Sequence, residues 1–484
     1  MERDWFVGAE RLLGCLGRLG LLTLSTLGLA ACMSQEPDSP IAIAVADTGE
    51  RPILITDVTV FDAASLALVP NQDVLVEGSL IAAIGPTGTL PVAAEAHQLA
   101  GEGATLVPGL VDMHGHLVIT TGPSWEVALP NPEDNLRAYL YAGVTTVFDP
   151  GDNSGEAAAR RDRVARGELL GPRIFTAGKI ITDPGGHPRA MVEELAPWWI
   201  GWYLKPQVAS GVATPEEAVA AVDERAALGV DAIKVVVDSI PLDASILPQQ
   251  VLKALVEQAS VRDLPVVAHI GTTEDAIAAG DNGVDLWVHG VYKERIPDED
   301  IARLAAYGIP MVTTSEVFDR YGRAMDGPIK PTMLEQQMVS DEKLASFYPP
   351  PEGFELGALE SWLELTQDTR EARLDNVGRL HAAGVVVLAG SDTQSGVFPG
   401  AGLHRELATL VDAGLSPAEA IRAATLLPAN VLAGDGEPEF GSIAVGKRAD
   451  LLLVNGDPTA NIGALADIRH VLRDGRLLER RSLK

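Results

Sequence analysis

Eight short apolar runs alternate with helical patterns through the middle of the chain, and this alternation constrains the fold more than any other feature. The expected strands lie at 107–113, 144–149, 173–177, 232–237, 265–270, 285–289, 309–314 and 385–391. Helical patterns separate most of them, as at 215–228, 249–262, 298–306 and 367–383. Eight strand–helix units predict a closed (β/α)₈ barrel of the TIM type, an α/β fold, although a doubly wound open sheet has the same pattern.

The segments on either side of this region have a different pattern. Partly alternating apolar and polar side chains, broken by turn residues, occur at 53–61, 73–84, 441–454 and 468–478. This texture is typical of antiparallel strands. We therefore expect the two chain ends to build one small β-sandwich domain from residues 53–106 and 436–484, with the barrel at 107–435 inserted between them.

The N-terminal segment has the pattern of an export signal. Residues 19–31 carry no charge, are too few to span a bilayer and end directly before Cys32. The sequence Leu-Ala-Ala-Cys at 29–32 resembles the lipobox of bacterial lipoproteins, in which a peptidase cleaves before the cysteine and a lipid modifies its sulfur. We expect a signal peptide at 1–31, lipidation of Cys32 and a flexible tether at 32–52. A buried apolar helix with a chance cysteine is the alternative.

This N-terminal pattern predicts an exported lipoprotein at the periplasmic face of the cell envelope. Met33, rather than an aspartate, follows the cysteine, which favours the outer membrane. Membrane contact is expected only through the lipid on Cys32. Because the net charge is -30, nucleic acid is not expected as a partner. The only other cysteine, Cys15, lies in the expected signal peptide, so no intramolecular disulfide is expected, and a homo-oligomer is left open.

Side chains of metal-ligand type end or follow several of the expected strands. His114 and His116 are two residues apart at the end of the first strand, so both point to one face. The others end strands four, five, six and eight, or lie close to those ends, at Lys234, His269, His289 and Asp392. Because the carboxyl ends of barrel strands meet at one rim, all six are expected to converge. The alternatives are structural histidines and, for the lysine, an ion pair on its strand.

Several motifs occur in a fixed order along the chain: VPGLVDMHGH, GVTTVFD, the Gly-Gly-His stretch at 185–187, DAIK, GSDT and GSIAVGKRADLLLV. Together with the two later histidines they resemble the metal-dependent amidohydrolase superfamily over residues 52–480. Within it, the chain is similar to the imidazolonepropionase-like and prolidase-like branch. After Lys234 the sequence VVVDSIP departs from the glycine-bearing segment of many relatives, which leaves the substrate geometry open.

The resemblance implies a site for two divalent metal ions, with Zn²⁺ expected. It implies that His114, His116 and Asp392 bind the more buried ion and that His269 and His289 bind the other. Lys234 would bridge the ions as a carbamate formed with carbon dioxide, because an ammonium next to two dications is strongly disfavoured. A mononuclear site with an unmodified lysine is the alternative.

The resemblance also implies the chemistry of this site. A hydroxide that bridges the two metals would attack a polarised carbonyl, and Asp392 would take its proton and deliver it to the leaving nitrogen. His187, on a loop after strand three, and His404, after strand eight, are expected to contact substrate, with loop capping and helix packing as alternatives. The segments 183–213 and 316–365 are expected to wall the pocket.

These expectations predict hydrolysis of an amide or peptide-like C–N bond in a small molecule such as a dipeptide, in a prolidase-like manner. A mononuclear cyclic-amide hydrolase of the imidazolonepropionase type and a deaminase are alternatives. A third alternative, from another class, is a lipoprotein that binds metal or ligand without turnover. No G-x-S-x-G, P-loop or G-x-G-x-x-G pattern occurs in the sequence, which argues against serine hydrolase and nucleotide-binding functions.

Overall fold

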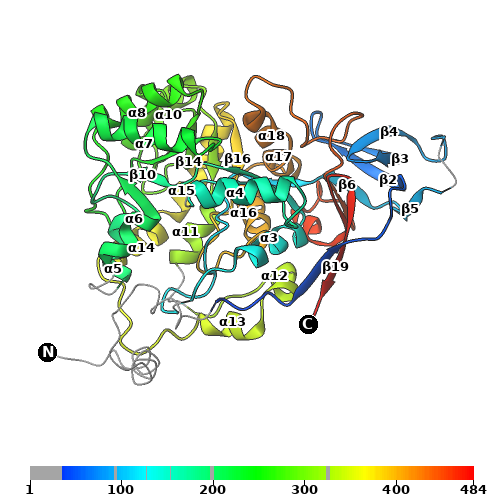
Figure 1. Ribbon diagram of the computed structural model, residues 1–484, viewed down its shortest axis with the longest axis horizontal. Helices are drawn as coiled ribbons and strands as arrows, with labels where there is room; N and C mark the ends of the chain where they lie inside the picture. Colours follow the sequence, from blue (N-terminus) through cyan, green and yellow to red (C-terminus); the bar gives the residue numbers. More distant parts are fainter. Residues whose placement is uncertain (1–34, 92–94, 127, 153, 197–200, 323–326) are drawn as a thin grey trace.

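The computed structural model describes residues 35–484 apart from 92–94, 127, 153, 197–200 and 323–326. The expected signal peptide and Cys32 lie outside the described residues. The strands form a nine-stranded, a seven-stranded and a three-stranded sheet. In Figure 1 the strands of the nine-stranded sheet gather at one end of the molecule, while the helices surround the other strands.

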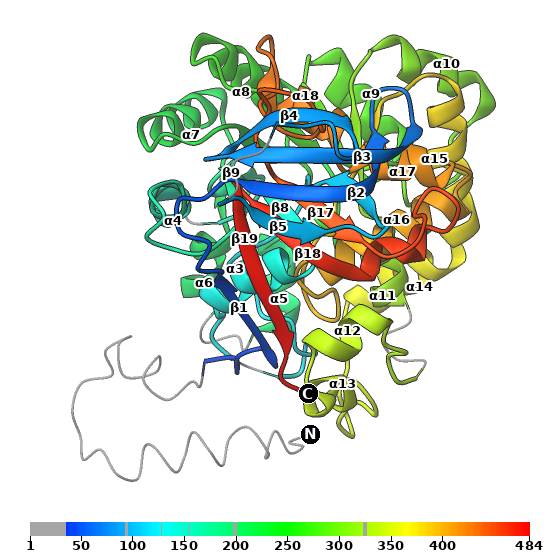
Figure 2. The ribbon, with the colours of Figure 1, turned by 90° about the vertical axis from the view of Figure 1, so that its right-hand side faces the viewer.

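The nine-stranded sheet contains strands from both ends of the chain, as predicted. Its path runs β1-β19-β18-β17-β6-β2-β3-β4, and β5 pairs with β2. The strands are β1 (Ile41–Val45), β2 (Ile53–Asp62), β3 (Ala67–Glu77), β4 (Leu80–Pro86), β5 (His97–Ala100), β6 (Thr105–Pro108), β17 (Leu451–Val454), β18 (Ile468–Arg473) and β19 (Arg476–Ser482). Figure 2 looks onto β2, β3 and β4 and shows β1 beside β19.

Strand β17 joins this sheet to the rest of the molecule. Leu451 and Leu453 are buried in the core of the nine-stranded sheet, whereas Leu452 and Val454 are buried in the large core beneath the helices. Because successive side chains of a strand point to opposite faces, one continuous apolar run serves two cores. The run of leucines in this strand is explained by burial on both faces.

The predicted tether at 32–52 is wrong for residues 41–45. These residues form β1, which pairs antiparallel with β19 from Ile41 opposite Ser482 to Val45 opposite Leu478. Nearer the N-terminus, the buried Glu36 accepts hydrogen bonds from Thr121 and pairs with Lys343 at 2.7 Å. Because the partners of these residues lie far along the chain, the local sequence does not indicate that this segment packs against the folded protein.

The other two sheets consist of parallel strands. They contain β7 (Leu110–Asp112), β8 (Val144–Asp149), β9 (Arg173–Thr176), β10 (Ile180–Thr182), β11 (Ala209–Gly211), β12 (Ile233–Val236), β13 (Val266–His269), β14 (Leu286–His289), β15 (Met311–Thr313) and β16 (Val387–Ala389). The strands predicted from residue 144 onward are confirmed at these positions. Backbone hydrogen bonds connect the two sheets at both edges: Met113 N donates to Ala389 O, and Asp231 N donates to Thr176 O.

The predicted first strand, 107–113, is two strands in two sheets. β6 pairs with β17 and β2 in the nine-stranded sheet, whereas β7 pairs with β8. The break lies at Gly109, where an added Cβ would collide with the side chain of Thr145. The apolar run is continuous because both strands are buried, so the boundary predicted between residues 106 and 107 falls instead at this glycine.

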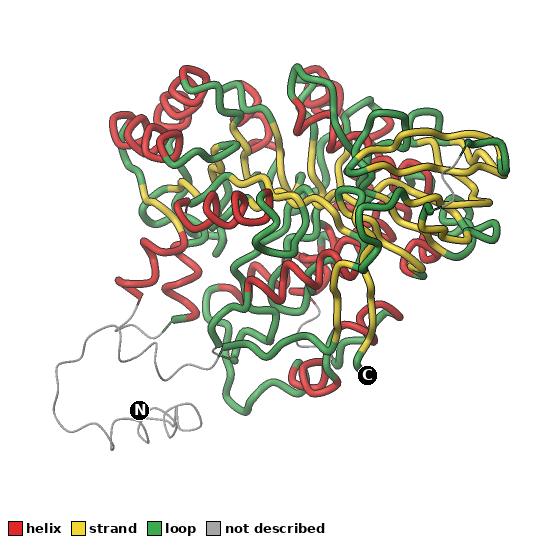
Figure 3. Tube along the Cα trace, turned by 45° about the vertical axis from the view of Figure 1, so that its right-hand side comes forward, coloured by secondary structure: helices red, strands yellow, loops and turns green. Residues whose placement is uncertain are grey.

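Helices follow most of the parallel strands, as Figure 3 shows. They are α3 (Pro132–Tyr141), α4 (Ser154–Ala165), α7 (Pro215–Ala227), α8 (Gln249–Val261), α9 (Thr273–Asp281), α10 (Asp298–Ala306), α15 (Arg370–Ala382), α16 (Ala401–Asp412), α17 (Pro417–Ala423) and α18 (Leu426–Ala433). Thr214 caps α7 in a capping box with Glu217, and Pro215 occupies the first turn. The predicted helix at 367–383 begins only at Arg370.

The two segments expected to wall the pocket are partly helical. Segment 183–213 contains α5 (Arg189–Leu195) and α6 (Gly201–Val208), while Trp198 and Trp199 lie outside the described residues. The second segment contains α11 (Ser315–Gly322), α12 (Met333–Met338), α13 (Asp341–Ser346) and α14 (Leu359–Asp368). None of the helices among the described residues combines the length and apolar character needed to cross a bilayer.

The carboxylate of Asp112 ties β7 to the residues after β16. It accepts hydrogen bonds from the backbone N–H of Ser391, at 2.9 Å, and from the Ser391 hydroxyl. We expect Ser391→Ala to lower the free energy of unfolding by about 1 to 3 kcal/mol, because it leaves a buried carboxylate oxygen without its donor. Urea unfolding measures this, with the exposed Ser361→Ala as the control. A loss equal to that of the control would contradict the assignment.

Glu406 connects α16 to the start of α11. Its Oε2 accepts a hydrogen bond from Glu316 N at 2.8 Å, and its side chain is fully buried. Burial raises the pKa of Glu406 to about 7 from its ordinary 4.5. The folded chain therefore binds the Glu406 proton more tightly than the unfolded chain does.

This shift predicts a pH-dependent effect of Glu406→Gln on stability. The stabilisation from protonated Glu406 is complete below pH 4.5 and is lost as the pH rises through about 7. Glutamine resembles the protonated acid, so the variant is expected to match the wild type near the lower pH and to exceed its free energy of unfolding by up to about 3 kcal/mol above neutrality. The wild-type–variant difference is measured across this range, with the exposed Glu364→Gln as the control. A difference independent of pH would contradict the prediction.

Candidate metal centre

Four of the predicted histidines form a continuous row of imidazole rings. His116 and His114 follow β7, while His289 and His269 end β14 and β13. The ring centroids are 5.2 Å apart for His116 and His114, 4.6 Å for His114 and His289, and 4.0 Å for His289 and His269. Since the strands are parallel, their carboxyl ends bring these side chains to one place, as the sequence predicts.

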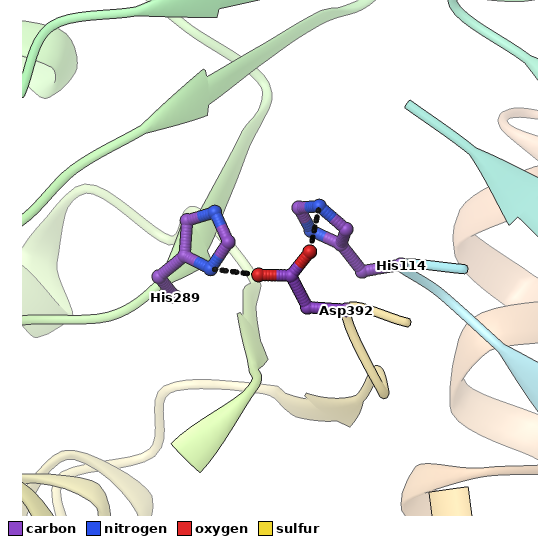
Figure 4. Close-up of side chains that lie close together, drawn as sticks. All are labelled: His114, His289 and Asp392. Carbon is purple, nitrogen blue, oxygen red and sulfur yellow. Dashed lines mark ion pairs between the residues drawn. The ribbon is translucent and has the colours of Figure 1, made fainter. Parts of the chain in front are cut away.

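Asp392, which follows β16, lies against this row. Its carboxylate oxygens are 3.1 Å from His116 Nε2, 3.6 Å from His114 Nε2 and 3.7 Å from His289 Nδ1. Figure 4 shows the last two of these contacts, with the carboxylate between the two imidazoles. One donor atom from each of His114, His289 and Asp392 lies within 4.8 Å of the others, a spacing at which the three could hold one metal ion.

The backbone at this cluster is unusual at two positions. Asp392 has a φ of 50° and His289 a φ of 75°, in the left-handed region that non-glycine residues seldom adopt. The Asp392 N–H donates a hydrogen bond to His114 O at 2.6 Å, which fixes the turn after β16 against β7. Such conformations concentrate at functional sites because the surrounding structure must hold them.

Burial keeps most of these imidazoles neutral. Burial, together with the positive charge of Lys234 and neighbouring histidines, holds the pKa of His114 and of His289 well below the ordinary 6.5. Burial lowers the pKa of His269 in the same way. For His116, burial also acts to lower the pKa, but the hydrogen bond and charge of Asp392 outweigh it, so the pKa is raised. Neutral imidazole is the form that binds a metal ion.

Lys234 lies on β12 and is only 2% exposed. Burial lowers the pKa of Lys234 to about 7, against the opposing charge of Asp392. A large fraction of this amine is therefore unprotonated near neutral pH, which is the form that can react with carbon dioxide or bind a metal ion.

The donor set fits a divalent ion of the zinc type. Imidazole nitrogens and a carboxylate are the ligands that zinc takes in hydrolytic sites. The buried Nδ1 of His114 has no hydrogen-bond partner within the described part of the chain, which is unusual for a buried polar atom. The compact group joins His289 to His114 and Asp392, whereas the resemblance implied that His289 binds a different ion from these two.

Sequence reasoning missed the groups that support these side chains. Thr314 Oγ1 lies 2.7 Å from His289 Nδ1, and Thr393 Oγ1 accepts a hydrogen bond from His116 N at 2.7 Å. Asp149, at the end of β8, lies 3.9 Å from His116 Nδ1. Thr314 and Asp149 end predicted parallel strands, and Thr393 follows a predicted ligand. Their place at the strand ends is the sequence feature that could have identified them.

The two expected substrate contacts have different surroundings. His187 is half-buried beside the row, with its ring centroid 5.1 Å from that of His269, and desolvation lowers its pKa to about 4. Its Nδ1 is buried without a hydrogen-bond partner among the described residues. His404 is not brought to the row: its Nε2 donates to Ala142 O at 2.8 Å, which is the contact expected of the packing alternative.

A cavity of about 1080 Å³ lies next to α11, α12 and α14. Its lining includes Trp125 after β7, residues of α11, α12 and α14, and Gln394, two residues beyond Asp392. Burial, followed by the charge of Asp392, raises the pKa of Tyr321, a lining residue on α11. Segment 316–365 supplies much of the wall of this cavity, and His404 lines it as well, whereas the six predicted metal ligands are not among the lining residues.

Comparisons with known proteins agree with this geometry. The family model of the amidohydrolase family matches residues 105–478. The imidazolonepropionase of Micrococcus luteus is 28% identical over 427 residues, which cover 83% of this chain and 92% of that enzyme. The adenine deaminase of Serratia proteamaculans (strain 568) is 37% identical over only 99 residues, so the match spans 20% of this chain and 15% of the deaminase's length.

Among solved structures, a Xaa-Pro dipeptidase with methionine bound in its active site has a similar fold. The TM-score is 0.69, the sequence identity is 24%, and the match covers 88% of this chain and 99% of the dipeptidase. At this level of identity the likeness is evidence of fold.

Proposed function

Because this chain belongs to the amidohydrolase family and is therefore a hydrolase that acts on carbon–nitrogen bonds, we propose that it cleaves an amide or peptide-like bond of a small molecule with the help of divalent metal ions. The observation that carries the proposal is the convergence of Asp392 and three imidazoles at the ends of parallel strands. A dipeptide is the favoured substrate class, since the fold is shared with a Xaa-Pro dipeptidase.

The proposed metal ligands are the six predicted side chains. Two ions of the zinc type are proposed, with ligands from His114, His116, Lys234, His269, His289 and Asp392, and with Lys234 carried as a carbamate. The unpartnered Nδ1 of His114 and the lowered pKa of Lys234 support this assignment. Bound divalent ions would lower the pKa of a water molecule toward neutrality and polarise the substrate carbonyl.

The residues of the chain then have distinct roles in the reaction. Asp392 takes the proton of the attacking water and returns it to the leaving nitrogen, because its carboxylate lies among the proposed ligands, 3.1 Å from His116 Nε2 and 3.6 Å from His114 Nε2. His187, with its free buried Nδ1, is proposed to face the substrate oxygen. The burial of His114, His289 and Asp392 limits access of bulk water and strengthens these interactions.

The same proposal includes the architecture predicted from the sequence. Strands β7, β8, β9 and β12 to β16 are proposed to form one closed (β/α)₈ barrel, supported by the Met113–Ala389 and Asp231–Thr176 backbone hydrogen bonds. The nine-stranded sheet is proposed to fold as the small β-sandwich domain.

We also propose that the chain is an exported lipoprotein anchored through Cys32, which is supported by the sequence before that cysteine. Its test is loss of radiolabelled-palmitate incorporation in Cys32→Ser.

A substrate panel tests the proposed function. The purified chain, loaded with Zn²⁺ and bicarbonate, is incubated with Xaa-Pro and other dipeptides, cyclic amides of the imidazolone type, and aminopurines. Release of free amino acids from dipeptides is the expected result. Turnover of cyclic amides alone would support the second candidate, which the imidazolonepropionase relative favours. Ammonia release from aminopurines alone, or no hydrolysis of any C–N bond, would contradict the proposal.

A further inference from the structure

A buried carboxylate behind the imidazole row has no role in the proposed reaction. Asp238 lies two residues beyond β12, within the VVVDSIP segment, and is 1% exposed. Its Oδ2 is 3.1 Å from Nε2 of His269, whose ring also lies against that of His289. Buried carboxylates are costly unless they are fully paired, so the partners of Asp238 indicate what it does.

Both oxygens of Asp238 are saturated by donors of the protein. Oδ1 lies 2.6 Å from Lys293 Nζ and accepts the Ser239 N–H at 2.8 Å, while Oδ2 also accepts the hydroxyl of Tyr292 at 2.7 Å. Lys293 in turn donates to the backbone and side-chain oxygens of Ser239. With four donors around it, the carboxylate has no oxygen left to bind a metal ion itself.

This pairing determines the proton position on His269. A carboxylate held by a lysine ammonium can only accept hydrogen bonds, so the nitrogen facing it must carry a proton. A neutral imidazole carries a proton on one nitrogen only, so the hydrogen bond from Nε2 to Asp238 decides which nitrogen that is. The second nitrogen, Nδ1, is then left with its lone pair.

The arrangement is anchored on several sides. Tyr292 is fully buried, accepts a hydrogen bond from Trp362 Nε1 at 3.1 Å and stacks on Phe318 with ring centroids 3.9 Å apart. Gly271 allows the approach of Asp238, because an added Cβ there would collide with the carboxylate. Trp362 lies on α14 and lines the cavity of about 1080 Å³, so the wall of the cavity and His269 are connected through three hydrogen bonds.

We propose that Asp238 is a positioning residue that holds His269 as the Nε2–H tautomer and thereby presents Nδ1 as a metal ligand. The metal in this statement depends on the proposed function. The orientation of the His269 ring depends only on the hydrogen bonds described above. Removal of a carboxylate that holds a ligating histidine in this way typically lowers metal affinity by roughly 10- to 100-fold.

The first test reads the tautomer in the metal-free wild-type chain. The chain is labelled with ¹⁵N-histidine, and long-range ¹H–¹⁵N correlation spectra near neutral pH distinguish the two tautomers of each ring. The signals of His269 are assigned by their loss in His269→Gln. The expected result is the Nε2–H pattern for His269. The Nδ1–H pattern would overturn the proposal before any variant of Asp238 is made.

The second test removes the carboxylate together with its buried counter-ion. Asp238→Ala combined with Lys293→Met leaves no unpaired charge, so the fold is expected to survive, and thermal unfolding checks this. His269 is expected to lose the pure Nε2–H pattern, and Zn²⁺ affinity, measured by competition with a chromogenic chelator, is expected to fall by roughly 10- to 100-fold. The matched control is Tyr292→Phe, which keeps the carboxylate and should keep the wild-type tautomer.

The two readouts separate this proposal from the proposed function. An unchanged tautomer and unchanged Zn²⁺ affinity in the double variant would overturn the role of Asp238. If the double variant unfolds, the wild-type spectrum still decides the proton position. A wild-type chain that binds no Zn²⁺, yet shows the Nε2–H pattern and loses it in the double variant, would refute the proposed function while confirming the orientation of His269.

Discussion

Asp392→Asn is expected to lower kcat/KM for C–N bond hydrolysis roughly 10³-fold, within the range that a general acid and base contributes. The amide keeps the size of the carboxylate but cannot take up or return a proton under these conditions. Asparagine also tolerates the left-handed backbone conformation, so the φ of 50° at this position is preserved. Steady-state kinetics on the most active dipeptide of the panel measures the effect.

A matched control separates chemistry from folding. Asp435→Asn changes an exposed aspartate after α18 and is expected to leave kcat/KM unchanged. Both variants should unfold within a few degrees of the wild type, because the Asp392 N–H that donates to His114 O is retained. Activity of Asp392→Asn within a factor of ten of the wild type would show that this carboxylate carries no proton in the reaction.

Lys234→Met is expected to abolish measurable turnover, with a loss of more than roughly 100-fold, which exceeds what an outer partner of a metal ligand contributes. Methionine fills nearly the same buried volume on β12 but offers no amine to carry a carbamate or to bind an ion. Elemental analysis should show fewer bound ions per chain than in the wild type.

The control for Lys234 is Lys253→Met on α8, where the side chain is 67% exposed. This variant should keep full activity and full metal content. Because removal of a buried amine leaves no unpaired charge, Lys234→Met is also expected to unfold no earlier than the wild type. Full activity with full metal content in Lys234→Met would exclude the lysine from the site.

Most of the parallel strands could be predicted because they are short, apolar and buried on both faces. Between Val144 and Ala389 the seven predicted strands agree with the observed positions to within a few residues, but β10 and β11, which are only partly buried, were not predicted. The first strand could not be divided correctly, because β6 and β7 form one apolar run and only the close approach of Thr145 to Gly109 separates them. Likewise, β1 depends on a partner near the other end of the chain, which no local pattern reveals.

Only those residues of the candidate site that lie at or near the ends of predicted strands could be predicted from the sequence. His114, His116, His269, His289 and Asp392 were found because polar side chains at the ends of apolar strands are conspicuous, and the structure brings them together. Asp238 was visible in the sequence as part of an unusual segment, but its role depends on Lys293 and Tyr292, which follow a different strand. For His404 the sequence could not reveal the hydrogen bond to the carbonyl of Ala142, while its expected contact with substrate stays a prediction for a residue that lines the cavity.

The metal content of the purified chain tests the central claim most directly. Elemental analysis after loading with Zn²⁺ and bicarbonate, followed by dialysis, is expected to give about two ions per chain and hydrolysis of dipeptides that is lost on chelation and restored by metal. A chain that retains no divalent ion after loading, or whose hydrolysis is unchanged when every ion has been removed, would contradict a metal-dependent C–N hydrolase.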